Sequence, residues 1–175
     1  MLQLGSERKR DAGLVLIDPH GDCADSVRKF YHNFNNNRIA YIDPFLREGM
    51  TPSINPFELQ HTDEQTIELA TSQLVDVFQE LIPDALLSNQ MRALLVPCIS
   101  TLLRCRDASL EDLQNFLRPG KNEEWLKIGR NSPIHSHRKF FNEDFNNPIY
   151  RATKQSILVK VQSLLNSRIF YNLTT

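Results

Sequence analysis

An apolar run that stops in a cluster of turn-forming polar residues is the feature that most limits how this chain can fold. Residues 13–22 read GLVLIDPHGD. A short apolar run bounded by turn residues is typical of a buried β-strand. It ends here because Pro19 has no N–H for a ladder and Gly21 permits a tight turn. The pattern therefore predicts a strand over residues 14–18 with a polar tip.

A helix and a second strand are expected to follow this tip. Apolar residues recur at helical spacing between 27 and 34, and Asp22 or Asp25 can cap the helix. Residues 38–43, RIAYID, predict another strand. Strand, helix and strand within about thirty residues predict a βαβ unit with parallel pairing. The expected fold class of residues 1–60 is therefore α/β.

The character of the sequence changes after the prolines at positions 44, 52 and 56. Beyond them, apolar residues recur at helical spacing and no convincing strand follows. Ser109, followed three residues later by Asp112, resembles a capping box. We therefore expect an all-helical domain over 61–170. Its helices are predicted over 62–81, 86–103, 109–117, 121–128, 137–145 and 149–165, and the apolar side of the first is expected to be Leu69, Leu74, Val77, Phe78 and Leu81.

Composition narrows the class of protein only slightly. The net charge of −1 gives no strong overall attraction to nucleic acid or to an anionic membrane. Cys23, Cys98 and Cys105 have no CxxC spacing, which favours free thiols in a reducing compartment. No window approaches the roughly 18 apolar residues of a membrane span, and the N-terminus does not resemble a signal peptide. The sequence therefore indicates a soluble cytoplasmic protein without membrane insertion.

The strand tips are the sharpest candidate site. Ligands of parallel sheets gather at the carboxyl ends of strands. Asp18, His20 and Asp22 lie at the first predicted tip, and Asp43 closes the second strand in the same way. Turn chemistry alone also explains an Asp-Pro pair. Both interpretations stay open for Asp18, whereas the turn interpretation is favoured for Asp43.

A metal site is a weaker interpretation of the same residues. Asp18 and His20 have the Asp-x-His spacing that begins the sites of metal-dependent phosphoesterases, whose divalent ions activate water. That chemistry needs further ligands at later strand ends, and the sequence predicts none there. His135 and His137 are expected to be a solvated helix start. We therefore expect no metal ligand and no catalytic residue, and keep a metal phosphoesterase as an alternative.

The sequence lacks a phosphate-binding loop, but it contains basic residues of the kind that contact phosphates. The pattern GxxxxGK[ST] is absent, because Gly120 and Lys121 are followed by Asn122. Basic residues cluster late in the chain and are interleaved with aromatic residues, which can form a DNA-backbone surface or an ordinary solvated helical surface. The candidate DNA-binding residues are Arg138, Lys139, Arg151, Lys154 and Lys160.

The order of three motifs is more specific than any one of them. GLVLIDPHGDCADSV, then NRIAYIDPF, then SINPFEL resembles the conjugative DNA-transfer ATPases, the coupling proteins of type IV secretion, which are related to the HerA and FtsK motors. In that family a strand ending in Asp-Pro-His/Lys-Gly-Asp/Glu follows the phosphate loop, and an all-helical domain is inserted later. The stretch from KFFNEDF to IFYNL resembles the closing helices of that insert. The resemblance covers nearly the whole chain.

The resemblance implies a function for each part of the chain. Residues 1–60 would be part of a RecA-like P-loop ATPase core. Within that core, the residues near the nucleotide would be Asp18, His20, Gly21 and Asp22. Residues 61–170 would be the inserted domain, which contacts DNA or the relaxase and other secretion-system proteins. The family binds ATP and magnesium, forms hexamers and works at the cytoplasmic face of the inner membrane.

Two features of the family lie outside this sequence, namely the Walker A loop and the magnesium-binding acidic strand. We therefore expect an internal fragment or truncated product, with no cofactor of its own and no ATPase activity alone. A protein–protein interaction module without DNA binding is the alternative from another class.

Overall fold

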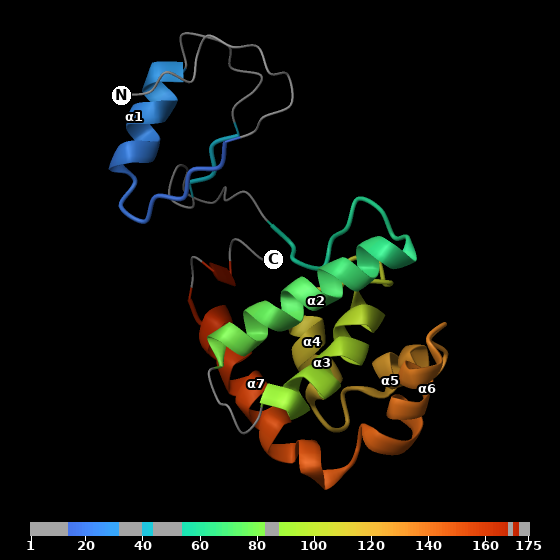
Figure 1. The fold of residues 1–175 in the computed structure, drawn as a ribbon. Helices are drawn as coiled ribbons and strands as arrows, with labels where there is room; N and C mark the ends of the chain where they lie inside the picture. The colour runs from blue at the N-terminus through green and yellow to red at the C-terminus, as the bar shows by residue number, and fades with distance from the viewer. Residues whose placement is uncertain (1–13, 32–39, 44–53, 83–87, 168–169, 172–175) are drawn as a thin grey trace. The chain divides into compact units, whose positions relative to one another are not determined.

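The computed structural model describes residues 14–31, 40–43, 54–82, 88–167 and 170–171 (Figure 1). The chain divides into two compact units, Met1–Ile42 and Asp43–Thr175. The described part of the first unit contains one helix, α1 (Asp22–Tyr31), and the described part of the second is mostly α-helical.

The predicted α/β fold class is wrong, because the described residues contain no β-strand. Residues 14–18 and 40–43 belong to no regular element, and Arg38 and Ile39 of the second predicted strand lie outside the described residues. A strand exists only through ladder hydrogen bonds to a neighbour, and a parallel sheet needs cover on both faces. The apolar run has no such cover, since Val15 and Ile17 are each 85% exposed.

The second unit follows the predicted order of helices. Figure 1 shows α3 at its centre, with α2 on one side and α5 and α6 on the other. The predicted capping box is confirmed: the Ser109 hydroxyl accepts from the Asp112 N–H at 3.3 Å and the Asp112 carboxylate accepts from the Ser109 N–H at 3.0 Å. The elements are α2 (Glu64–Leu81), α3 (Ser88–Leu102), α4 (Leu110–Leu117), α5 (Glu123–Arg130), α6 (His135–Lys139), the π-helix η2 (Phe140–Asp144), the 3-10 helix η3 (Pro148–Tyr150) and α7 (Arg151–Leu165).

Helix α2 buries a different face from the one that the sequence predicts. Its N-cap is Asp63, one residue after the predicted Thr62. Leu69 is 61% exposed and Val77 is 49% exposed, so the predicted apolar side is wrong at these two positions. The face of α2 that is buried is the one that packs against α3, and this face includes Thr71. The buried residues are Ile67, Thr71, Val75 and Phe78.

The core of the second unit joins α3 to a cluster of aromatic rings. Met91, Leu94, Leu95, Ile99 and Leu102 of α3 have no exposed surface. In the same core, aromatic rings from α4, α5, η2 and the residue after η2 stack, tilt or meet edge to face, with centroids between 5.5 and 6.1 Å apart. The ring cluster consists of Phe116, Trp125, Phe140, Phe141 and Phe145.

The Asn-Pro turn before α2 is packed into this second unit. Asn55 donates from its side-chain amide to the Ala108 carbonyl at 2.7 Å and accepts from the Phe57 N–H at 3.0 Å. Phe57 is only 3% exposed and belongs to the core. The SINPFEL motif therefore begins the helical unit, whereas the sequence-based boundary places it at the end of the first domain.

Candidate functional site

Asp18 closes the turn that precedes α1. Its carboxylate accepts hydrogen bonds from the backbone N–H groups of His20 at 3.1 Å, Cys23 at 2.8 Å and Ala24 at 3.0 Å. These bonds, that of Ala24 above all, lower the pKa of Asp18. Gly21 has a φ of +83°, a left-handed conformation that favours glycine.

The structure thus gathers the four predicted nucleotide-proximal residues in one turn. Asp18 satisfies N–H groups that the first turn of a helix otherwise leaves free, while His20 and Asp22 are exposed. Asp18 therefore caps the first turn of α1, a role that the sequence predicts for Asp22 or Asp25. A phosphate at this helix end would have to compete with a carboxylate of the chain itself.

Replacing Asp18 with alanine is expected to loosen the first turn of α1. The amide hydrogens of Cys23 and Ala24 lose their acceptor and should exchange faster with solvent. Asp18→Asn keeps a side-chain oxygen and should retain most of the protection. Hydrogen exchange of these amides by NMR measures the effect, and equal exchange in Asp18→Ala and the parent chain would contradict the capping role.

Two of the five predicted DNA-binding residues are bonded to backbone carbonyls. Arg138 donates from Nη1 to the carbonyls of Ser132 at 2.7 Å and Pro133 at 3.0 Å. Lys154 donates from Nζ to the Phe145 carbonyl at 2.7 Å, with its ammonium 3.5 Å from the centroid of the Phe145 ring. Burial lowers the pKa of Lys154. Both side chains hold turns of the protein in place.

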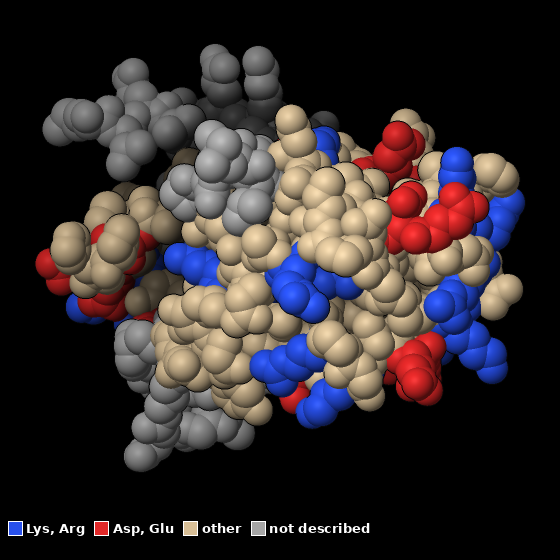
Figure 2. All heavy atoms as spheres, turned by 90° about the horizontal axis from the view of Figure 1, so that it is seen from below, with Lys and Arg blue, Asp and Glu red and all other residues tan. Residues whose placement is uncertain are grey.

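The other three predicted residues do not share one face. Lys139 lies 3.9 Å from the Glu143 carboxylate, and both side chains are 61% exposed. Arg151 and Lys160 lie about two and a half turns apart on α7, and hence on opposite sides of it. Figure 2 shows Lys and Arg side chains at several separate places on the face seen from below, with acidic side chains beside some of them. The structure therefore does not bring the predicted set together.

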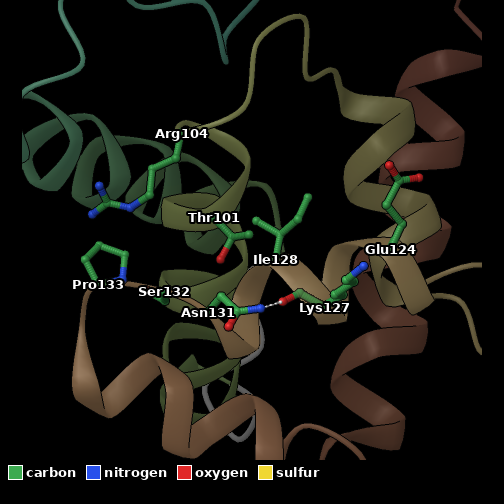
Figure 3. Close-up of a pocket in the computed structure, with 8 residues that line it drawn as sticks. All are labelled: Thr101, Arg104, Glu124, Lys127, Ile128, Asn131, Ser132 and Pro133. Carbon is green, nitrogen blue, oxygen red and sulfur yellow. Dashed lines mark hydrogen bonds between the residues drawn. The ribbon is translucent and has the colours of Figure 1, made fainter.

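A first hollow of about 500 Å³ lies between the C-terminal end of α3, helix α5 and the turn after it. Figure 3 shows Arg104 and Pro133 on one side of it and Lys127 and Ile128 on the other. The Asn131 side-chain amide donates to the Lys127 carbonyl at 2.8 Å and closes the turn.

A second hollow of about 600 Å³ lies between α3 and the segment from α6 to η2. Its apolar lining includes Ala93, Val96, Pro97 and Phe140. Pro97 cannot donate the usual intrahelical hydrogen bond to the Ala93 carbonyl. A π-helix also borders it, an element found frequently at functional sites.

Arg104 lines the first hollow and His137 lines the second. Arg104 holds both carboxylate oxygens of Glu64 with its two terminal nitrogens, each at 2.7 Å. Its Nε is buried without a hydrogen-bond partner, and so is Nδ1 of His137. Burial, and secondarily the Arg104 charge, lowers the pKa of His137. The sequence prediction of a solvated His137 missed this, because its neighbours come from distant segments.

The lowered pKa of His137 predicts a loss of stability in mild acid. In the unfolded chain His137 is protonated near pH 6.5, whereas in the folded protein it stays neutral to a lower pH. The free energy of unfolding should therefore fall as the pH drops below about 6.5, and carboxylates contribute only at still lower pH.

Urea unfolding of the parent chain and of His137→Asn, between about pH 7 and about pH 5, measures this effect. The free energy of unfolding of His137→Asn should fall much less over this pH range than that of the parent chain. His135→Asn, at an exposed position, is the control. If His137→Asn loses as much stability over this pH range as the parent chain, another group is responsible for the acid sensitivity.

Among the described residues, no group of three or more His, Cys, Asp or Glu side chains could hold a metal ion. No helix in the described ranges is both long and apolar enough to cross a membrane. Cys23, Cys98 and Cys105 are free thiols. No family model matches the chain, and no curated protein or solved structure matches it.

Proposed function

We propose that this chain is part of a DNA-translocating ATPase of the conjugative-transfer class and that its helical unit contacts a protein rather than DNA. The order of the Asp-Pro-His-Gly-Asp turn, the YIDPF segment and the Asn-Pro turn supports the first half of the proposal. The proposal places the chain in the cytoplasm, where its three free thiols persist.

The distribution of basic side chains carries the second half of the proposal. A DNA-backbone surface needs several Lys and Arg side chains that can reach phosphates together. Arg138 and Lys154 are instead bonded to carbonyls, and Arg151 and Lys160 point to opposite sides of α7. A chain with a net charge of −1 gains little from long-range attraction to DNA.

A titration of labelled single-stranded and double-stranded DNA at several salt concentrations tests the protein-contact hypothesis. We expect weak binding with little salt dependence. If all five predicted residues contacted B-DNA phosphates, the slope of log K against log salt would be about −4.5, at about −0.9 per contact. A slope of that size, reduced by Arg151→Glu and Lys160→Glu but not by Lys121→Glu, would establish DNA contact and contradict the proposal.

The motor assignment has a separate test in the coding sequence. A GxxxxGK[ST] pattern encoded in frame on the amino-terminal side of Met1 is expected, because the phosphate loop precedes the Asp-Pro-His-Gly-Asp strand in this class. An in-frame stop codon immediately upstream, with no such pattern in the same gene, would contradict the assignment.

A further inference from the structure

The second hollow, between α3 and the segment from α6 to η2, contains one charge that the chain does not balance. Its charged lining consists of Arg92, Lys139 and Asp144. Arg92 donates from Nη1 to the Asp76 carboxylate at 2.8 Å, and Lys139 lies 3.9 Å from the Glu143 carboxylate. Among the described residues, no ion pair or side-chain hydrogen bond engages the Asp144 carboxylate. When the acids that pair with the two cations are counted, the hollow has an excess of one negative charge.

The imidazole in the second hollow adds no competing positive charge. Burial lowers the pKa of His137 below its ordinary value of 6.5, so the ring is neutral at pH 7, and its Nδ1 is buried without a hydrogen-bond partner. The first hollow differs, because its charges are balanced. There Arg104 is held by Glu64, and Lys127 is matched by Glu124 of the same lining. The second hollow is therefore the one whose charge favours a cation.

The same lining offers a backbone acceptor and an apolar surface. Pro97 has no N–H, so the Ala93 carbonyl lacks its usual intrahelical donor and can accept a hydrogen bond from a ligand. Val96 and Phe140 supply apolar contacts, and an aromatic ring also attracts a cation. The volume of about 600 Å³ lies within the range of small-ligand sites. The hollow thus suits a ligand with a cationic donor at one end and an apolar body.

We propose that the second hollow binds a primary ammonium group on an unbranched apolar stem, and that the Asp144 carboxylate and the Ala93 carbonyl accept from the ammonium. The stem contacts Val96 and Phe140. Hydrogen bonds between an ammonium and a carboxylate are stronger than those between neutral groups. A small alkylamine and a lysine side chain of another protein share this chemistry. The inference depends on this hollow alone, so it is independent of the motor assignment and of the DNA titration.

An NMR titration of the isotope-labelled chain with pentylamine and with pentanol tests the inference, because the two ligands share a stem and differ in charge. Pentylamine should shift the amide resonances of residues that line the hollow, with an affinity that falls as salt rises. Pentanol should bind about tenfold more weakly or less, because it cannot pair with Asp144. A short peptide with one lysine between glycines distinguishes the two sources of the ammonium. If the peptide binds more tightly than pentylamine, the site accepts a protein lysine, and if pentylamine binds more tightly, it accepts a free amine.

Matched variants separate binding in the hollow from general charge effects. Asp144→Asn should weaken pentylamine binding about tenfold or more, whereas Glu111→Gln, at an exposed position of α4 outside both hollows, should not. Ala93→Leu fills the hollow and should also weaken binding, whereas Ala152→Leu, at an exposed position of α7, should not. Equal binding of pentylamine and pentanol, equal effects of Asp144→Asn and Glu111→Gln, or the absence of shifts at the hollow would each overturn the ammonium site.

Discussion

Replacing Phe116 with alanine is expected to lower the free energy of unfolding of the helical unit by about 3–5 kcal/mol, a large share of the roughly 5–15 kcal/mol that is typical of a domain. The Phe116 side chain has no exposed surface. Its ring lies 5.5 Å from that of Phe141, 5.7 Å from that of Phe145 and 6.0 Å from that of Trp125. Truncation therefore leaves a cavity at the point where α4, α5 and η2 meet.

Denaturant unfolding, followed by the fluorescence of Trp125, measures this loss. Phe30→Ala is the matched control, because the Phe30 ring is 63% exposed in the first unit. Its effect on the unfolding of the helical unit should stay below about 0.5 kcal/mol. A loss in Phe116→Ala no larger than that of the control would show that the aromatic cluster does not hold the unit together.

Local chemistry made most of the helical unit predictable from the sequence. The start of a helix depends on hydrogen bonds between groups a few residues apart, so Ser109 and Asp112 predict the start of α4 from the sequence. The turn before α1 is equally local, since Asp18 accepts from an N–H group six positions away, although the sequence pattern predicts the cap at Asp22 or Asp25. Such signals fix where elements begin, but they do not show which face will be buried, as Leu69 and Val77 demonstrate.

The mistaken strand shows why an apolar run alone does not determine structure. The hydrophobic pattern of residues 14–17 indicates which side chains a strand would bury. Whether a strand forms depends on hydrogen bonds to another segment. The described part of the first unit supplies none, and its apolar side chains stay exposed. The predicted sheet-edge site is consequently a helix-capping turn.

The residues of the two hollows could not be predicted for a related reason. Arg104 and Glu64 are 40 positions apart, and they meet only because α2 and α3 pack together. Lys154 looks like a surface lysine in the pattern of α7, yet it bonds to the Phe145 carbonyl. Non-local packing thus bonds two of the predicted DNA-binding side chains to backbone carbonyls and creates the two hollows.

Replacing Gly129 with alanine is expected to destabilise the helical unit, although alanine is the better helix former. A Cβ at this position in α5 would lie 2.6 Å from Cδ2 and Cε2 of Phe141. Phe141 is 1% exposed and stacks on Phe116 with an interplanar angle of 12°, so its ring has little room to move. Overpacking of this kind costs about 1–3 kcal/mol, which exceeds the gain of at most about 1 kcal/mol in helix propensity.

The double variant Gly129→Ala with Phe141→Leu distinguishes a steric clash from any other role of the glycine. Leucine lacks Cε2, and its Cδ methyl groups can rotate away from the new methyl group, so in the Phe141→Leu background Gly129→Ala should cost much less than in the parent chain. A double-mutant cycle of urea unfolding gives the coupling energy between the two positions. If Gly129→Ala destabilises both backgrounds equally, the close approach of α5 to η2 is not what requires a glycine there.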